Sequence, residues 1–421
     1  MSHAGTDRRT VAKSALLGAS LLLSGAGAAP AWARAGARGR PRGGQDVTLE
    51  LPAPTGPYRT GITTLYLVDR ARRDPWDPAV PVREVMVTVF YPARTVRGRP
   101  RAPQMTASAA RAFAEFVPFA FHQELPKAGV DWAATMTHAH VGAPARAVRC
   151  PVVLYSPGGG DARTLGTCTA EELASRGCVV VTIDHPGDAS EVEFPGTTAY
   201  RDRVVRPTVF TGDPRTDPGI FRTMIEARVA DIRFVLDRLA LLAAGRAADA
   251  AGRPLPEGLG GALDLRRVGV YGHSAGGTAA AQALYEDRRI AAAIDMEGFL
   301  DHPPLEPGGA GELFPVARYG VGRPLLLLGT DGFTGRHALE PSWSAVAARS
   351  GGCVRRGRLD RAAHAVFTDY AAMAPQLQAA GLMTAAERIG LVGAVGPAAA
   401  VRAVRRRVVS FFGRHLPVRG V

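Results

Sequence analysis

Short, unbroken apolar runs alternate with segments of helical periodicity along most of this chain. Such runs predict buried strands over residues 85–91, 151–155, 178–183, 268–271, 290–294 and 324–328. Apolar residues at helical spacing predict helices over residues 169–176, 221–242, 276–285 and 398–412. Strands that are apolar on both faces and alternate with helices form mostly parallel sheets with helices on both faces. The sequence therefore predicts an α/β fold of this kind.

The loops that follow the predicted strands are the candidate site, because ligands of such sheets bind beyond the carboxyl ends of the strands. These loops are residues 156–161, 184–186, 272–276, 295–298 and 330–334. Two further stretches, residues 102–145 and 194–219, have little strand character. We expect them to be insertions that cap or line the site, and not a separate domain.

Residues 1–44 have the pattern of an export signal followed by a flexible linker. Arg8 and Arg9 precede an apolar run, residues 15–29, that is too short and too rich in small residues to span a bilayer. The Ala-Trp-Ala of residues 31–33 supplies a cleavage site. The arginine pair resembles a twin-arginine signal, which exports folded proteins, and an ordinary secretory signal is the alternative. We therefore expect a secreted or extracytoplasmic protein whose mature domain is residues 45–421.

Charge and cysteine content exclude several other classes of protein. The net charge is +13, from 51 Lys+Arg and 38 Asp+Glu, but the arginines are scattered among acids and do not indicate a nucleic-acid partner. No C-x-x-C motif occurs, so neither a zinc ribbon nor a thioredoxin-like site is predicted. In an exported protein the cysteines could form two disulfides or stay free, and the sequence leaves both open. They are Cys150, Cys168, Cys178 and Cys353.

Residues 272–276 carry the motif that bears most directly on chemistry. They match G-x-S-x-G, with a predicted strand before and a predicted helix after, which is the context of a nucleophile elbow. The flanking glycines leave room for the sharp turn that holds Ser274 at the tip of the sheet. The helix that begins there directs backbone N–H groups at developing negative charge. We interpret Ser274 as a nucleophile, and a structural glycine turn is the alternative.

A serine nucleophile needs a base, and the chain offers few histidines after the last predicted strands. His364 is the favoured base because it follows residues 354–359, which could be the final strand. His337, in a polar loop, and His415, past the last helix, are weaker candidates. His138 and His140 form an H-x-H pair, but no third ligand stands at a suitable spacing, so no metal site is predicted.

The acid of a catalytic triad is harder to choose from the residues. In α/β-hydrolases the order along the chain is serine, acid, histidine. Asp295 and Glu297 follow the first strand after Ser274, and Asp331 follows the second. The second strand is the usual position, which favours Asp331, and the residues alone leave all three open.

Several segments together resemble bacterial relatives of the group II platelet-activating-factor acetylhydrolases. They are residues 154–160 (Leu-Tyr-Ser-Pro-Gly-Gly-Gly), 183–186 (Ile-Asp-His-Pro), the elbow at 272–277 and 367–369 (Phe-Thr-Asp). The resemblance extends over nearly the whole mature chain. It implies an α/β-hydrolase fold with capping insertions and a serine carboxylic-ester hydrolase that needs no metal or organic cofactor. It also implies a small-molecule or lipid ester as substrate, with at most peripheral contact with a membrane.

The resemblance also implies roles for individual residues. Glu297, in Met296-Glu297-Gly298, occupies the place of the family's triad acid, with Glu where the family has Asp. The oxyanion hole would be formed by the N–H groups of Gly159 and Ala275. The catalytic set implied is therefore Ser274, His364 and Glu297.

Other functions on the same fold remain as alternatives. A secreted lipid-binding protein without catalysis would share the fold. A lipase, a polyester hydrolase or an amidase would share the triad as well, because the same three groups serve all of these reactions. The acyl length, the head group and the oligomeric state are not indicated by the residues.

Overall fold

The computed structural model describes residues 46–304, 309 and 311–418. The predicted export segment, residues 1–44, lies outside the described residues. In the described part of the chain no helix is both long and apolar enough to cross a membrane. The four cysteines are unbridged, and three of them are buried.

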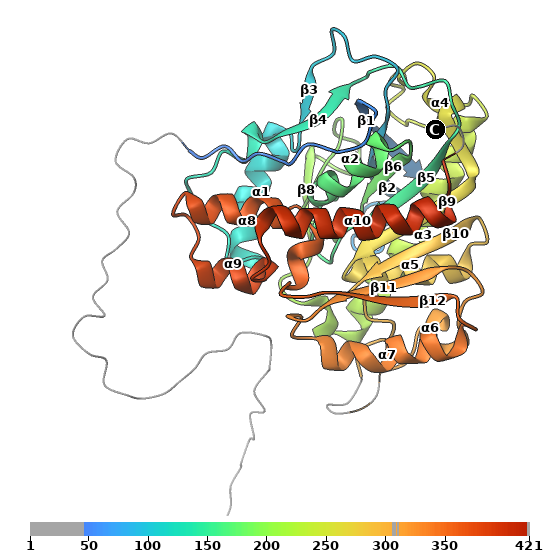
Figure 1. Cartoon of the computed structure of the whole chain (residues 1–421). Coiled ribbons are helices and arrows are strands. Elements are labelled where there is room, and N and C mark those ends of the chain that lie inside the picture. The colour runs from blue at the N-terminus through green and yellow to red at the C-terminus, as the bar shows by residue number, and fades with distance from the viewer. Residues whose placement is uncertain (1–45, 305–308, 310, 419–421) are drawn as a thin grey trace, which may run out of the picture. The chain divides into compact units, whose positions relative to one another are not determined.

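The strands of the described residues form one 10-stranded sheet in the order β12-β11-β10-β9-β5-β6-β2-β1-β4-β3, and a separate ribbon of β7 and β8 (Figure 1). The six strands β5, β6 and β9 to β12 run parallel, whereas β2 is antiparallel to both β6 and β1. Their bounds are β1 Thr60–Asp69, β2 Arg83–Pro92, β3 Arg101–Pro103, β4 Met136–Val141, β5 Cys150–Ser156, β6 Val179–Asp184, β7 Glu191–Glu193, β8 Val205–Pro207, β9 Leu263–His273, β10 Ile290–Met296, β11 Leu325–Thr330 and β12 Val354–Leu359.

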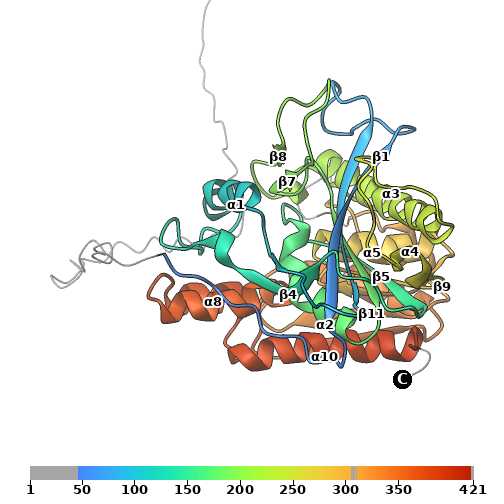
Figure 2. The ribbon, with the colours of Figure 1, turned by 90° about the horizontal axis from the view of Figure 1, so that it is seen from above.

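Helices cover both faces of the sheet. The helices are α1 Ala107–Ala120, α2 Thr167–Ser175, α3 Pro218–Ala243, α4 Leu259–Ala262, α5 Ala275–Glu286, α6 Pro315–Tyr319, α7 Arg336–Arg349, α8 Tyr370–Ala379, α9 Ala385–Val392 and α10 Pro397–His415. Short 3-10 turns are η1 Trp132–Ala134, η2 Arg163–Gly166, η3 Pro214–Thr216 and η4 His364–Phe367. Figure 2 shows α2 and α10 on one side of the strands and α3 and α5 on the other.

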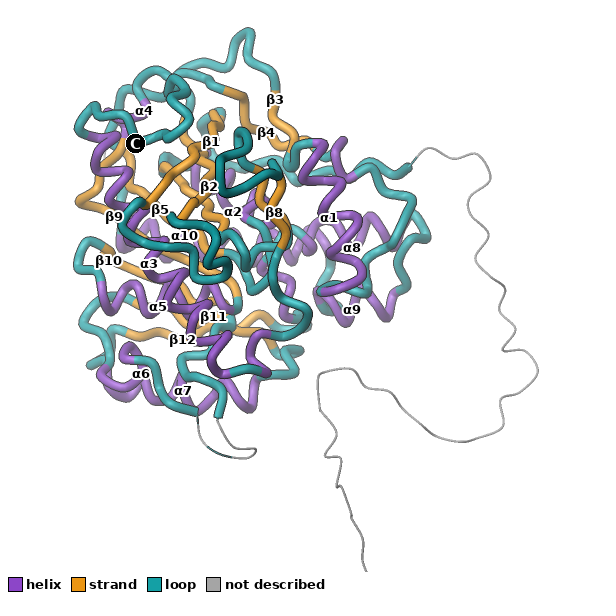
Figure 3. Tube along the Cα trace, turned by 180° about the vertical axis from the view of Figure 1, so that it is seen from behind, coloured by secondary structure: helices purple, strands orange, loops and turns teal. Residues whose placement is uncertain are grey.

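Strand β5 shows why the sheet needs both layers. Leu154 packs in the core that contains side chains of α3 and α5, and its neighbours Val153 and Tyr155 pack in the core that contains side chains of α2 and α10. Successive side chains of a strand point to opposite faces, so an unbroken apolar run must be covered on both. A third core joins α1, α8 and α9, which lie together in Figure 3. The fold is the predicted α/β-hydrolase fold, with a mostly parallel central sheet.

Two predictions about the insertions need correction. Residues 102–145, in which the sequence shows little strand character, contain β4, which pairs with β1 and adds to the central sheet. Residues 194–219 contain β8, which forms the ribbon with β7. Both strands are short, and β4 alternates small buried residues with histidines (Met-Thr-His-Ala-His-Val), so neither has the apolar run of a central strand. Strand β1 was not predicted either.

The order of the strands fixes where a site can form. From β5 the chain moves outward to β6 on one side, and from β9 it moves outward through β10 to β12 on the other. The loops that follow β5 and β9 therefore diverge at a point between two neighbouring parallel strands. Such a switch point leaves a crevice at the carboxyl edge of the sheet, where ligands of this class of fold bind.

Candidate active site

Ser274 occupies a sharp turn between β9 and α5. Its backbone has φ 53° and ψ −124°, in the positive-φ region that costs a residue with a side chain on the order of 1–3 kcal/mol. Glycines are required on both sides of Ser274 because backbone atoms of neighbouring segments lie too close for a side chain. A Cβ on Gly276 would lie 2.0 Å from the carbonyl oxygen of Ser156, and one on Gly272 would lie 2.1 Å from that of Gly276. The turn therefore holds the Ser274 hydroxyl at the edge of the sheet, where the side chain is partly exposed.

Glu297 lies beside this turn, just beyond the end of β10. The N–H of Ser274 donates to the carbonyl oxygen of Met296 at 2.8 Å, which joins the two strand ends. Glu297 also has a positive φ, 61°, and its side chain is buried. Its Oε1 accepts hydrogen bonds from the N–H and the hydroxyl of Thr330 at 2.5 and 2.7 Å. These bonds leave Oε2 directed at His364, 2.7 Å from the Nδ1 atom.

His364 begins the turn η4, after the edge strand β12. Its ring stacks on Phe333, with centroids 4.3 Å apart, and contacts the ring of His273 at 4.4 Å. The two rings and the carboxylate of Glu297 fix the orientation of the imidazole. When Nδ1 carries the proton toward a carboxylate, Nε2 is free to accept a proton from another group.

The other two candidate acids lie in supporting positions. Asp331 accepts hydrogen bonds from the N–H groups of Arg361 and Ala362 at 2.8 and 3.1 Å, and these bonds lower its pKa. Asp295 is fully buried and accepts from the N–H of Gly298 at 2.6 Å; its burial raises its pKa well above the usual range. Asp331 therefore supports the loop before His364, and Asp295 supports the turn that carries Glu297.

The other histidines that the sequence offered as candidates lie away from this contact. His337 is exposed on α7, and His415 ends α10, where its ring contacts Phe411. The Nε2 of His138 lies 2.9 Å from the carbonyl oxygen of Leu51. No cluster of His, Cys, Asp or Glu that could hold a metal occurs within residues 46–304, 309 and 311–418.

The glycine loop after β5 is held from behind by Arg228 of α3. This arginine is fully buried, and its guanidinium donates to the carbonyl oxygens of Pro157 and Gly158 at 2.5 and 2.8 Å. The carbonyl and the following N–H of a trans peptide point in opposite directions. Fixing the carbonyl of Gly158 therefore turns the N–H of Gly159 away from Arg228. A Cβ on Gly159 would lie 3.7 Å from that of Ala275, so the two predicted oxyanion donors lie on adjacent loops.

The arginine is itself held by a carboxylate. Asp188 accepts from Arg228 at 2.6 and 2.8 Å, and from the N–H of Gly160 at 3.0 Å. One buried ion pair thus fixes Pro157, Gly158 and Gly160, on both sides of Gly159. Nothing in the sequence distinguished Arg228, because α3 carries it among apolar residues at helical spacing.

A second Ser-His-Asp constellation lies under the same loop. The Oγ of Ser156 is 2.9 Å from the Nε2 of His185, and the Nδ1 of His185 is 3.0 Å from Asp231. Arg83 pairs with the same carboxylate at 2.7 Å. All of these side chains are 0 or 1% exposed, so no substrate reaches this serine. The constellation fixes the end of β5, and it explains the Asp-His-Pro segment as structural.

The arrangement at the carboxyl edge can carry out nucleophilic acyl transfer. It combines a serine on a strained turn, an imidazole oriented by a buried carboxylate, and backbone N–H groups at the start of a helix. The N–H groups of the first helical turn lack acceptors within the helix, so they are available to an oxyanion. Thr330, which the sequence marked only as part of a candidate loop, adds the contact that orients Glu297.

Comparisons with known proteins support this interpretation. A family model described as platelet-activating factor acetylhydrolase, isoform II, matches residues 48–419. A probable 1-alkyl-2-acetylglycerophosphocholine esterase of Arthroderma benhamiae is 30% identical over 167 residues, which are 39% of this chain and 35% of that protein. The chain thus matches about a third of the length of this curated relative. The structure of a ferulic acid esterase from Streptomyces cinnamoneus superposes with a TM-score of 0.67 and 32% identity, covering 89% of this chain and 94% of that one.

Proposed function

The chain belongs to the family of isoform II platelet-activating factor acetylhydrolases, and from this premise we propose that it is a serine ester hydrolase that acts through Ser274, His364 and Glu297. The observation that carries the proposal is the contact of 2.7 Å between His364 and the buried carboxylate of Glu297, beside the turn that holds Ser274. The resemblance to two esterases supports the same class of reaction.

The reaction has two halves that use protein groups and water. The Oγ of Ser274 attacks the ester carbonyl while His364 takes its proton, and the leaving alcohol receives that proton as the acyl-enzyme forms. Glu297 stabilises the imidazolium that exists between these steps. Water, activated by the same histidine, then hydrolyses the acyl-enzyme and returns the serine.

The tetrahedral oxyanion of each half is bound by backbone N–H groups. Ala275 supplies one donor from the first turn of α5, and Gly159 supplies the other from the loop that Arg228 holds. Donors fixed in advance are effective because they do not have to reorganise as the charge develops. The proline of the Ser-Pro-Gly-Gly-Gly loop does not matter to this role, since both donors are main-chain groups.

A short p-nitrophenyl ester and a serine-directed organophosphate test this function together. The protein is expected to hydrolyse the ester, to lose activity after treatment, and to carry the phosphoryl group on Ser274. A folded protein that neither hydrolyses the ester nor becomes labelled would instead be a binding protein on the same fold.

Arg215 favours a substrate that carries a phosphate. Its guanidinium lies 3.7 Å from the ring centroid of Phe299, and the adjacent Pro214 would lie 3.7 Å from a Cβ on Gly159. The carboxylate of Asp301 is 3.9 Å from the guanidinium, too far for a tight pair. The guanidinium also donates to the carbonyl oxygen of Asp301 at 3.1 Å. A cation that follows Pro214, the neighbour of the oxyanion loop, suits an anionic group on the substrate. This agrees with an acetylglycerophosphocholine ester, the substrate class in the name of the curated relative.

An aromatic acyl ester is the second candidate. It is favoured by the extent of the match to the ferulic acid esterase and by the ring of Phe333, which stacks on His364 and contacts the ring of Phe299. Comparing an acetylated phospholipid, methyl ferulate and p-nitrophenyl acetate separates the two. With a phospholipid substrate, Arg215→Met should raise KM for the phospholipid about tenfold and leave p-nitrophenyl acetate unchanged. A preference for methyl ferulate that Arg215→Met does not alter would favour the aromatic ester.

Export completes the proposal. Residues 1–44 would act as a twin-arginine signal and linker, and residues 45–421 as a single α/β-hydrolase domain that reaches its destination folded. The arginine pair, the short apolar run and the Ala-Trp-Ala segment support this assignment. The protein would then meet ester substrates outside the cytoplasm.

A further inference from the structure

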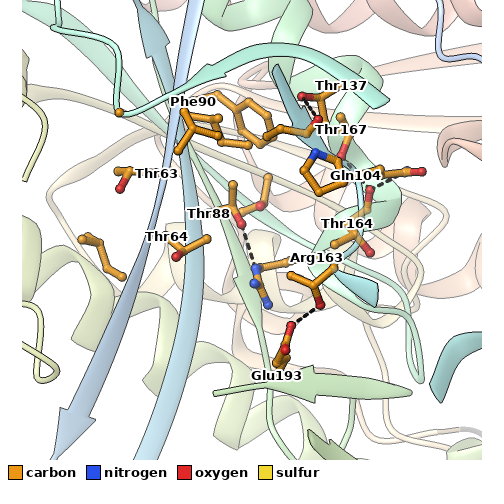
Figure 4. A pocket seen from close by; sticks show the side chains of 18 of the residues that line it. Thr63, Thr64, Thr88, Phe90, Gln104, Thr137, Arg163, Thr164, Thr167 and Glu193 are labelled. Atoms are coloured by element: carbon orange, nitrogen blue, oxygen red, sulfur yellow. Dashed lines mark hydrogen bonds between the residues drawn. The ribbon is translucent and has the colours of Figure 1, made fainter. Parts of the chain in front are cut away.

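A cavity of about 540 Å³ lies over strands β1, β2 and β6, on the face of the sheet that α2 covers (Figure 4). Its floor includes Thr64, Thr88 and Thr182, which are paired across the three strands. Its wall includes Gln104, which follows β3, and Thr137 of β4. The side chains proposed as the triad are absent from its lining in the described part of the chain. The cavity is therefore separate from the candidate active site.

One end of the cavity is acidic. Asp184, Glu191 and Glu193 line it with Arg163, and Figure 4 shows Arg163 and Glu193 at the same end. Arg163 pairs with Asp184 through its guanidinium, and its N–H donates to the same carboxylate at 2.6 Å. The hydroxyl of Thr106 donates to Glu193. The positive charge of Arg163 thus offsets Asp184. The other arginines of the lining are Arg253, which pairs with Asp249, and Arg99. Neither Glu191 nor Glu193 forms an ion pair among the described residues.

Three polar atoms of buried residues that line the cavity have no hydrogen-bond partner among the described residues. They are the Oε2 of Glu191, the Oε1 of Gln104 and the Oγ1 of Thr182. Their side chains belong to residues that are 3, 6 and 1% exposed. A buried polar atom without a partner costs about 1–3 kcal/mol, so such atoms in native proteins are normally satisfied by water or a ligand. A carboxylate and an amide oxygen both call for a hydrogen-bond donor.

Glu191 carries a proton of its own, which takes the place of a hydrogen-bond donor from another group. Burial raises its pKa to about 8, and the carboxylates of Asp184 and Asp161 act in the same direction. The positive charge of Arg163 acts against this rise. A ligand that brought a positive charge and N–H donors would replace the proton and pair with the carboxylate of Glu191.

We propose that this cavity binds a small primary ammonium ion with a short apolar chain, whose ammonium group is held by Glu191. An ammonium group supplies three donors and the charge that the acidic end lacks. The apolar chain would lie against Ile62, Phe90 and Met105, which line the cavity beyond the acidic end. The volume is within the range of small-molecule sites, about 300–1,000 Å³. An anionic ligand is disfavoured by the carboxylate of Glu193, and it brings no N–H donors for the buried acceptor oxygens of Glu191 and Gln104.

Calorimetric titration of the intact protein at pH 7 with n-hexylamine, sodium hexanoate and hexan-1-ol tests the proposal. Hexylammonium should bind and raise the melting temperature, hexan-1-ol should bind more weakly, and hexanoate should not bind. Binding should release about one proton, seen by comparing buffers of different ionisation heat, because Glu191 must ionise. Glu191→Gln keeps the shape but not the charge, and should weaken hexylammonium binding about tenfold to a hundredfold and abolish the proton release.

A second pair of variants tests binding in the cavity and leaves the buried Glu191 unchanged. Val141 lines the mouth of the cavity and Val148 does not, yet each is 45% exposed. Val141→Arg should weaken hexylammonium binding about threefold or more by charge repulsion, while Val148→Arg should not. Binding of hexanoate as tight as that of hexylammonium, no binding of hexylammonium, or equal affinity of the Val141→Arg and Val148→Arg proteins would overturn the proposal.

Discussion

The Nδ1 of His364 lies 2.7 Å from the Oε2 of Glu297, although 67 positions separate the two residues. Three neighbouring parallel strands, β10, β11 and β12, bring them together, because each strand ends at the same edge of the sheet. Glu297 follows β10, Thr330 ends β11 and orients the carboxylate, and His364 comes after β12. The contact is therefore a consequence of the strand order, and Ser274, at the end of the next strand, β9, completes the proposed triad.

Ser274→Ala should abolish ester hydrolysis and leave the fold intact. Loss of a triad nucleophile costs on the order of 10⁴-fold or more in kcat. Steady-state hydrolysis of p-nitrophenyl acetate, with circular dichroism as a check on folding, measures this.

Ser156→Ala is the matched control for that variant. Ser156 contacts His185, which in turn contacts Asp231, but the serine is buried. Its loss should therefore cost stability of about 1–3 kcal/mol and change kcat by less than about tenfold. A folded Ser274→Ala protein with near-normal turnover would end the esterase proposal.

Arg228→Lys should lower kcat by about tenfold to a hundredfold with little change in KM. A lysine keeps the charge but cannot hold two carbonyls and Asp188 at once, so the N–H of Gly159 would lose its fixed direction. Arg228 is thus a positioning residue, and kinetics with a short p-nitrophenyl ester at several pH values would show a lower kcat with an unshifted pH profile.

Arg83→Lys separates this effect from simple destabilisation. Arg83 is equally buried and pairs with Asp231, but its other contacts are Asp74 and the carbonyl oxygen of Pro186. We expect a similar fall in melting temperature and a kcat within about threefold of the wild type. Equal losses of kcat in both variants would mean that Arg228 acts only through stability.

The strands next to the site could be predicted because their apolar runs have to be buried on both faces, and the Ser274 motif has a strict local context. The acid could not be chosen from residues alone. Asp295, Glu297 and Asp331 all follow strands. Their contacts in the structure distinguish them, because Glu297 contacts His364 whereas Asp331 accepts hydrogen bonds from the backbone of residues 361 and 362.

Long-range contacts between ordinary residues also escaped the sequence. Arg228 has the pattern of a helix residue, and its role depends on loops 40 and 70 positions away. The floor of the cavity over β1, β2 and β6 is built from threonines, which are common in any strand. Strands β4 and β1 were missed because each carries polar residues within its run, so neither has the uninterrupted apolar pattern of β5 or β6.

Glu171→Gln should change how stability depends on pH. Burial raises the pKa of Glu171 to about 7, from about 4.5 for a free side chain. Between these values the folded protein keeps a proton that the unfolded chain has released, so the wild type loses stability as the pH rises from about 4.5 to about 7. Glutamine imitates the protonated form. The melting temperature of the variant, relative to the wild type, should therefore increase across this window and level off above it.

Glu172→Gln is expected to show the opposite trend. Burial acts against ionisation here too, yet hydrogen bonds from Thr55 and Arg176 lower the pKa of Glu172. The ionised Glu172 thus stabilises the wild type at pH values above the pKa of a free glutamate. The variant should therefore be the less stable protein at pH 7. The difference should shrink as the pH falls through the lowered pKa. If the melting temperatures of the two variants, each relative to the wild type, changed with pH in the same direction, this account of the adjacent glutamates would be contradicted.

Replacing Arg8 and Arg9 by lysine should block export if the route is twin-arginine, because that pathway reads the guanidinium pair. An ordinary secretory signal needs only positive charge and would tolerate the change. The amounts of mature protein outside the cytoplasm, compared by immunoblot for the wild type and the double variant, decide between the routes. Normal secretion of the double variant would contradict the twin-arginine assignment.

The most direct test of the proposed triad compares kcat for Glu297→Gln and Asp331→Asn on one short-chain ester. Each change removes a charge and keeps the size of the side chain. The proposal expects Glu297→Gln to lose about 10⁴-fold in kcat with little change in KM, as for a triad acid, with Glu297→Asp intermediate. It expects Asp331→Asn to stay within about tenfold of the wild type. A severe loss of kcat in Asp331→Asn, together with a nearly normal kcat in Glu297→Gln, would contradict the assignment of Glu297.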